Sequence, residues 1–238
     1  MQIPELLARA TQLRAARPVR NRAAEWYSVK AETGEVFIYD EIGFWGTTAK
    51  GFVKDIEAIT GDLTVHLNSP GGDVFDGIAI YNALKSRKGR TVCVVDSLAA
   101  SAASVIAMGG DEIEIAEAGM LMIHDAWGMC VGNEADMTAT GELLGKASDI
   151  IADIYRAKGG GTREKWRARM REETWYSATE AVDARLADRV TDYADPDASA
   201  AFDLSIFNHA GRPNAPAPDL GPDLDPVEFS TLLKEAFK

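Results

Sequence analysis

The stretch TVCVVDSLAASAASVIAMGG, residues 91–110, joins a run of β-branched residues to a run of small residues with helical spacing. Valine and threonine favour strands and alanine favours helices, so we predict a buried strand over 91–97 and a helix over 100–109. The preceding stretches repeat this order, with a strand pattern over 62–69 and a helical pattern over 73–87. Strands that alternate with helices are typical of parallel βαβ units with right-handed crossovers. The sequence therefore predicts an α/β fold.

Further elements extend this pattern on both sides. We predict strands at 25–31, 35–42, 112–116 and 120–124, a helix at 48–59, a long helix from Glu134 to Ala157, a helix capped by Thr162 that runs to Met170, and a capping box of Ser177 and Glu180 ahead of a helix at 181–186. Glycines at 159–161 end the long helix. Because this helix follows the last of these strands, we expect it to project from the sheet or to pack on a partner subunit.

Composition narrows the class of protein. The 238 residues are 46% hydrophobic, yet no apolar run approaches the roughly 20 residues of a membrane-spanning helix. The formal net charge of −12 disfavours binding to nucleic acid or to anionic lipid. Two cysteines, Cys93 and Cys130, do not make a disulfide framework in a chain of this size. We expect a cytoplasmic protein that binds neither nucleic acid nor membranes.

Charge and proline content divide the chain into four parts. Residues 1–23 are basic and arginine-rich, and we expect them to form a docking helix or a removable pro-segment. The globular domain covers 24–194. Six of the nine prolines fall in 195–226, which predicts a poorly ordered linker. Residues 227–238 have the spacing of a short amphipathic helix.

Three serines lie in the opening stretch, and each is a candidate nucleophile or a small packing residue. A nucleophile suits a strand-to-helix junction, because the first N–H groups of the helix can hold a developing oxyanion. Ser101 has alanine on both sides, which leaves its hydroxyl and the Ala102 N–H open to approach. Ser97 is interpreted as a turn or cap residue and Ser104 as a packing residue.

The stretch LNSPGGDVFDG, residues 67–77, is a second candidate site. A strand ends, Pro70 fixes a turn, two glycines free the main chain, and a helix begins. Such a junction is either an ordinary turn or an oxyanion site, because helix N-termini present unpaired N–H groups. The sequence lacks the glycine-rich motifs of nucleotide-binding loops.

The three histidines differ in their surroundings. His124 ends a predicted strand and opens into a loop, so it is the candidate general base. His66 lies within a strand, where a satisfied structural histidine is expected, and His209 lies in the predicted linker. No ligand spacing for a metal is present, and we expect no cofactor. Pattern alone does not choose the acid that orients the base among Glu172, Glu173, Asp183 and Asp188.

These motifs, in this order, resemble the Clp protease family of serine peptidases. The resemblance covers roughly residues 34–193 and rests on NSPGG with DGIAIYNAL, then SLAASAASVIAMGG, MLMIH and WYSATEAVDARLADRV. It implies the spiral of βαβ units that Clp proteases share with crotonases, together with a protruding long helix. It also implies a ring-shaped homo-oligomer that acts on protein substrates.

The resemblance also implies roles for individual residues. Ser101 matches the nucleophile, His124 the general base, and Gly72 and Ala102 the two oxyanion donors. The third triad position holds aspartate in the family but falls on Glu173 here, with Glu172 as the neighbouring alternative. The segments beside which a substrate strand lies match at Asp73, Val74, Asp125 and Trp127.

Residues 24–56 are similar to the phage and prophage branch, the head maturation proteases. This implies cleavage of capsid, scaffold or portal proteins in the host cytoplasm, with self-cleavage near the basic N-terminus or within 195–226. Three alternatives remain. They are a crotonase-type acyl-CoA enzyme, a non-catalytic assembly module, and a housekeeping peptidase that works with an ATP-driven unfoldase.

Overall fold

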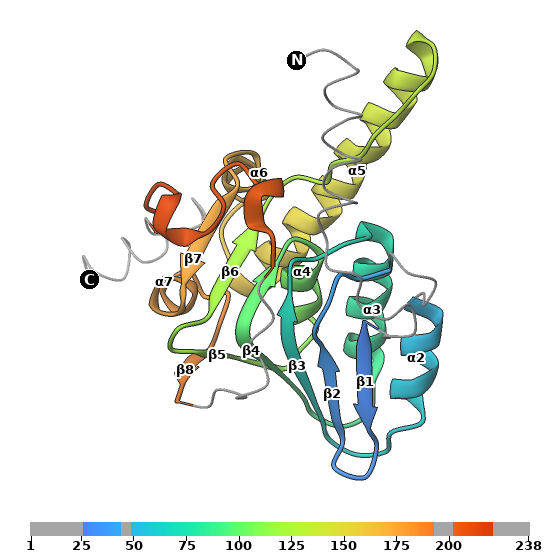
Figure 1. Cartoon of the computed structure of the whole chain (residues 1–238), viewed down its shortest axis with the longest axis vertical. Coiled ribbons are helices and arrows are strands. Elements are labelled where there is room, and N and C mark those ends of the chain that lie inside the picture. The colour runs from blue at the N-terminus through green and yellow to red at the C-terminus, as the bar shows by residue number, and fades with distance from the viewer. Residues whose placement is uncertain (1–25, 44–48, 193–201, 221–238) are drawn as a thin grey trace, which may run out of the picture.

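The computed structural model describes residues 26–43, 49–192 and 202–220. The strands of these residues form one eight-stranded sheet (Figure 1), in which the path β1-β2-β3-β4-β5-β8 is continuous, β6 pairs with β4, and β7 pairs with β6. The strands are β1 (Tyr27–Lys30), β2 (Glu35–Ile38), β3 (Leu63–Ser69), β4 (Thr91–Ala100), β5 (Glu112–Ala116), β6 (Met120–Ile123), β7 (Thr174–Ser177) and β8 (Arg189–Thr191).

Strand β4 connects the two parts of the sheet because it is long enough to pair with two different strands. Its first half lies parallel to β5, with Val95 opposite Ile115, whereas its last three residues lie parallel to β6, with Ala100 opposite Met122. The central pairs β2–β3 and β3–β4 are also parallel, as the βαβ pattern predicts. Antiparallel pairs occur at β1–β2 and at β6–β7.

The helices of the described residues are α2 (Ala49–Glu57), α3 (Val74–Ser86), α4 (Ala102–Ala107), α5 (Glu134–Gly159), α6 (Arg163–Arg171) and α7 (Ala178–Asp183). Helices α2, α3 and α4 cover one face of the sheet (Figure 1). The core lies between these helices and the sheet, where residues such as Leu67, Ile80 and Ile106 are fully buried. Helix α5 extends well beyond the body of the molecule, as its position after the strands predicts (Figure 1).

Side-chain caps set the helix boundaries where the sequence predicts them. Thr162 accepts a hydrogen bond from Lys165 N–H at the start of α6, and Ser177 and Glu180 form the expected capping box. That box opens α7 at Ala178 rather than at residue 181. Helix α5 ends at Gly159, and Gly160 adopts φ 79°, which glycine tolerates without steric cost.

The strand-to-helix junction at residue 100 differs from the prediction. Strand β4 runs to Ala100 rather than to 97, so the prediction of Ser97 as a turn or cap residue is wrong. The residues Leu98–Ala100 have weak β propensity, but hydrogen bonding to β6 holds them extended, and this tertiary pairing overrides local preference. Strands β7 and β8 are short, and the sequence pattern did not predict them.

Residues 202–220, called the 202–220 segment below, fall within the predicted linker, yet they pack on the domain. They form two short 3₁₀ turns, Leu204–Ile206 and Arg212–Asn214, and lie beside β6 and β7 (Figure 1). Phe207 is 8% exposed and packs in an apolar cluster with Met122 and Trp175. The domain boundaries stay predictions, and the predicted segments 1–23 and 227–238 lie outside the described residues. Within the described ranges, no helix has the length and apolarity that crossing a membrane requires.

Candidate active site

Ser101 stands at the junction between β4 and α4. Its N–H donates to the Met122 carbonyl at 3.0 Å, and its own carbonyl accepts from Ser104 N–H and Val105 N–H at the start of the helix. The residue adopts φ 55° and ψ −124°, a conformation rare outside glycine that costs on the order of 1–3 kcal/mol. The sharp turn leaves the Ser101 side chain partly exposed among buried neighbours.

His124 lies next to Ser101 because of the register between β4 and β6. Ala100 of β4 is opposite Met122 of β6. Ser101, which follows β4, and His124, which follows β6, therefore meet at the same edge of the sheet. His124 Nε2 is 2.7 Å from Ser101 Oγ, which is hydrogen-bond distance. The structure therefore joins the predicted nucleophile to the predicted base.

Glu173 follows from the antiparallel pairing of β6 and β7. Ile123 lies opposite Thr174, and the same antiparallel register brings the next two residues, His124 and Glu173, to the same end of the strand pair. Glu173 is 3% exposed, whereas its neighbour Glu172 is exposed. Of the two candidates, only Glu173 lies in the buried site, and its role in a triad stays a prediction.

The Glu173 carboxylate does not bind the His124 ring directly. It accepts hydrogen bonds from Trp175 Nε1 at 3.1 Å, from Asn208 N–H at 2.7 Å and from His209 N–H at 2.9 Å. Among the described residues, no hydrogen bond joins Glu173 to His124. Its charge still acts on the imidazole, because the carboxylate raises the pKa of His124.

Gly72 lies in the turn that contacts Ser101 through Gly71, and Ala102 follows Ser101 in the chain. Ile42 N–H donates to the Gly71 carbonyl and Asp73 N–H donates to the Ile42 carbonyl, so the N–H of Gly72 points away from Ile42. A Cβ on Gly71 would lie 2.6 Å from Ser101 Cβ and 3.0 Å from Ala102 N, so this turn touches the nucleophile. Only glycine permits this approach. The geometry is compatible with two main-chain donors beside Ser101 Oγ, and their role stays a prediction.

The four predicted substrate-binding residues have different surroundings. Asp73 caps α3 by accepting from Phe75 N–H and Asp76 N–H, and Val74 is the first residue of that helix. Asp125 forms an ion pair with Arg167 at 3.1 Å, while burial raises the pKa of its carboxyl. Trp127 is 71% exposed.

Some main-chain groups of the segment after His124 are already hydrogen-bonded within the domain. Asp125 N–H donates to the Met170 carbonyl at 3.2 Å, and Ala126 N–H donates to Ser148 Oγ at 2.9 Å. These two main-chain donors are therefore not available to a substrate strand. Any such pairing has to use other main-chain groups of this segment.

Two other predictions from the sequence concern structural residues. Ser104 is fully buried, donates to the Ser101 carbonyl at 2.6 Å and lies 2.8 Å from the Tyr155 hydroxyl, as expected for a packing residue. His66 is buried in β3, where its Nδ1 lies 3.0 Å from Asp96 and its ring stacks on Phe37. Each has its hydrogen-bonding groups engaged inside the fold.

Burial controls the protonation of the candidate base. Desolvation lowers the pKa of His124 below its ordinary value of 6.5, and the Glu173 carboxylate opposes this shift to a smaller extent. A general base must be neutral to accept a proton, and burial favours the neutral form. His124 is therefore neutral at neutral pH, as its predicted role of general base requires.

From the predicted role of His124 as general base, we expect the acid limb of the pH profile of kcat/KM to have its midpoint below pH 6.5, because a protonated imidazole accepts no proton and burial lowers the pKa of His124. The measurement is peptide hydrolysis from pH 4.5 to 8.5 at constant ionic strength. An acid limb with a midpoint above 7 would contradict a buried, neutral base.

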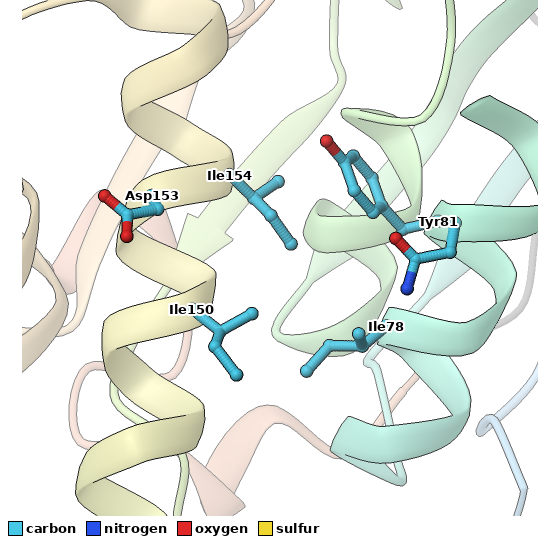
Figure 2. Close-up of a pocket in the computed structure, with 6 residues that line it drawn as sticks. Ile78, Tyr81, Ile150, Asp153 and Ile154 are labelled. Carbon is cyan, nitrogen blue, oxygen red and sulfur yellow. The ribbon is translucent and has the colours of Figure 1, made fainter. Parts of the chain in front are cut away.

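A separate cleft of about 320 Å³ lies between α3 and α5 (Figure 2). Its lining residues are Ile78, Tyr81, Asn82, Ile150, Asp153 and Ile154. It contains none of the predicted catalytic residues.

Sequence reasoning missed the groups that bind Glu173. The N–H groups of Asn208 and His209 belong to the 202–220 segment, and the Trp175 indole belongs to the unpredicted strand β7. A signal was present in FDLSIF, residues 202–207, where four apolar residues interrupt an otherwise polar, proline-rich stretch. Apolar residues at this density predict a segment that packs rather than a free linker.

Comparison with solved structures gives the fold. A mutant ClpP1 from Listeria monocytogenes superimposes with a TM-score of 0.60 at 22% identity, and the match covers 71% of this chain and 95% of that one. The α/β fold predicted from the sequence is therefore confirmed.

Curated relatives from bacteria and from Chlorella vulgaris match part of the chain. ATP-dependent Clp protease proteolytic subunits are 30% identical over 135 residues in Deinococcus radiodurans and 27% identical over 131 residues in Borreliella afzelii. The matches cover 55% and 54% of this chain and 65% and 66% of those relatives, so the chain spans just under two thirds of their length. The profile of the Clp protease family matches residues 20–194, which include Ser101, His124 and Glu173. Because this match extends over most of the chain, the chain belongs to the Clp protease family.

Proposed function

We propose that the protein is a serine endopeptidase in which Ser101 is the nucleophile and His124 the general base. The observation that carries the proposal is the 2.7 Å contact between Ser101 Oγ and His124 Nε2 at a sharp strand-to-helix turn. A serine hydroxyl is a weak nucleophile unless an adjacent base accepts its proton. A neutral imidazole at this distance supplies that base.

The mechanism is acyl transfer. Ser101 Oγ attacks the carbonyl carbon of the peptide, and its proton passes to His124 Nε2. The Gly72 and Ala102 N–H groups stabilise the oxyanion of the tetrahedral intermediate. Protonated His124 then gives its proton to the leaving amine, and a water molecule hydrolyses the acyl-enzyme by the same path. The Glu173 charge stabilises the imidazolium form, since the carboxylate raises the pKa of His124.

The proposed substrates are proteins of an assembling phage head, namely capsid, scaffold or portal proteins. Residues 24–56 support this choice, because they resemble the entry segment of phage head maturation proteases. A housekeeping role with an ATP-driven unfoldase is the second candidate. It is favoured by the curated relatives, which are proteolytic subunits of ATP-dependent Clp proteases.

A ring of identical subunits is part of the proposal. Large apolar side chains are exposed on α5 and on the loop before it. Monomeric proteins rarely expose a large apolar patch, and such a patch often marks a protein–protein interface. They are Met129, Val131, Met137, Leu143 and Ile150. A second copy of the chain would cover these side chains.

Labelling with a fluorophosphonate tests the nucleophile. We expect one adduct per chain, at Ser101, because only this serine is hydrogen-bonded to a histidine in the described residues. No lysine or arginine lies between Arg90 and Lys146, so tryptic digestion leaves all three serines in one peptide and tandem mass spectrometry has to locate the adduct. The Ser104→Ala variant should remain labelled. The proposal would be contradicted if the assembled wild type stayed unlabelled, or if the adduct were at Ser97 or Ser104.

Co-expression distinguishes the two kinds of substrate. A head maturation protease should cut the capsid, scaffold or portal protein encoded beside its gene at a few sites, without ATP. A housekeeping peptidase should instead degrade unrelated proteins to short peptides only when an unfoldase and ATP are added. Ser101→Ala is the control for background proteolysis in both experiments.

A further inference from the structure

The Glu173 carboxylate lies at the meeting point of the active site and the 202–220 segment. Two of its three hydrogen-bond donors, Asn208 N–H and His209 N–H, belong to this segment, which lies outside residues 20–194 of the family match. We propose that the 202–220 segment is a positioning element of the active site, whose main-chain N–H groups hold Glu173 and whose Phe207 side chain supports His124. The inference rests on the proposed peptidase function and names a part of that site.

The hydrogen bonds to Glu173 are the first support. A carboxylate that is almost fully buried is costly unless donors replace its lost hydration. Glu173 is 3% exposed and receives donors on both oxygens, at 2.7 Å from Asn208 and 2.9 Å from His209. Without the segment, only the Trp175 indole remains as a donor. The segment therefore supplies most of the interactions that fix this charge.

Phe207 is the second support, because it contacts the base itself. Its ring meets the His124 ring edge to face, with centroids 5.7 Å apart, and meets Trp175 in the same way at 5.6 Å. Such pairs prefer this geometry and restrict rotation of both rings. Phe207 also shields the imidazole from water, which contributes to the burial that lowers the pKa of His124.

Anchors hold the segment in place at some distance from the catalytic residues. Arg212 forms a two-pronged ion pair with Glu180 at the start of α7, with distances of 2.6 and 2.5 Å. This pairing lowers the pKa of the Glu180 carboxyl to about 2. Arg169 of α6 donates to the Asp219 carbonyl at 2.6 Å. The segment is thus tied to the domain at two points that follow Asn208 and His209 in the chain.

The position of the segment favours support over inhibition. His124 Nε2 is bonded to Ser101 Oγ and not to the segment, and both residues remain partly exposed with the segment in place. Near the reactive pair, the contacts of the segment are made to Glu173 and to the His124 ring. Within the described residues, the segment forms no hydrogen bond with Ser101 Oγ or with His124 Nε2.

Truncation is the main test. A chain that ends at residue 201 loses the segment, whereas a chain that ends at residue 220 keeps it and serves as the matched control. We expect fluorophosphonate labelling of Ser101 to slow about 10- to 100-fold in the shorter chain and to stay at the wild-type rate in the longer one, since small displacements of catalytic groups have effects of this size. Labelling of the shorter chain that is equal to or faster than wild type would overturn the inference.

A second measurement does not depend on activity. Histidine NMR with labelled imidazole carbons gives the pKa of His124, and the chain contains only two other histidines, His66 and His209. Loss of the segment removes burial, the larger cause of the shift, so the His124 pKa should rise toward 6.5 in the shorter chain. The charged group that acts on the ring, Glu173, is present in both chains. An unchanged His124 pKa would contradict the proposed contact.

Point variants keep the test valid if the shorter chain does not fold. Arg212→Ala removes the anchor but no catalytic group, and it should slow labelling and raise the His124 pKa, with partial rescue in Arg212→Lys. Arg189→Ala is the matched control, because Arg189 pairs with Glu112 and Glu114 at the far edge of the sheet. If the shorter chain does not fold, a wild-type labelling rate and a wild-type His124 pKa in Arg212→Ala would refute the inference. If wild type itself is unlabelled, the peptidase proposal fails, and the NMR result still decides whether the segment supports His124.

Discussion

Replacing Ser101 by alanine is expected to lower peptide hydrolysis by about 10⁶-fold, since removal of the nucleophile in a serine peptidase has an effect of this order. The remaining rate would come from the oxyanion donors and from substrate binding, which do not need the hydroxyl. The measurement is the initial rate with a fluorogenic peptide, at protein concentrations at which the wild-type rate is proportional to concentration.

Ser97→Ala is the matched control for this variant. Ser97 lies in β4, the strand that ends just before Ser101, and is also partly buried. No catalytic contact involves Ser97, so the rate of this variant should stay within a few-fold of wild type. Hydrolysis by Ser101→Ala at a rate near that of wild type would show that the chemistry resides elsewhere. It would favour the crotonase-type alternative, which needs the oxyanion donors but no serine.

Gly72→Ala is expected to reduce the rate by about 10²- to 10³-fold, the usual effect of losing one oxyanion donor. Gly72 adopts φ 149°, and a Cβ there would lie 2.1 Å from the Ile42 carbonyl oxygen and 2.6 Å from Ile42 N. These are main-chain atoms, so the turn itself has to move, and its N–H would shift away from Ser101. The measurement is kcat/KM together with the melting temperature.

Gly61→Ala is the control for a methyl group added to a glycine with positive φ. Gly61 adopts φ 93° ahead of β3, and a Cβ there would meet no atom within 4 Å. This variant should melt below the wild-type temperature because of backbone strain, but it should keep its rate. If Gly72→Ala also keeps its rate while remaining folded, Gly72 is not an oxyanion donor.

The sequence was sufficient for the parts of the fold that depend on local pattern. Strand and helix periodicity predicted the parallel βαβ units around β3, α3, β4 and α4, and capping residues such as Thr162 and Ser177 marked helix starts. These features are readable because each depends on residues within a few positions of one another. The order of the motifs also led to the family that the comparisons confirm.

Longer-range features were less predictable. The extension of β4 to Ala100 depends on β6, and the short strand β7 is held by the same partner. Residues 202–220 were expected to be a linker because of their prolines, although Phe207 packs against Trp175. In each case the deciding contact joins residues that are distant in sequence. A local pattern such as the apolar residues of 202–207 can indicate that a segment packs, but not against which residues.

The amino-acid sequence by itself determined that Ser101 and His124 are the residues to consider, because Ser101 lies at a predicted strand-to-helix junction, His124 ends a predicted strand, and their motifs occur in the order typical of one family. Only the tertiary structure decided that they touch, since that depends on the register between β4 and β6. The tertiary structure also separated Glu173 from Glu172, by burying one carboxylate and exposing the other. The physical reason is that a buried charge requires donors, and those donors come from residues 35 and 36 positions away along the chain.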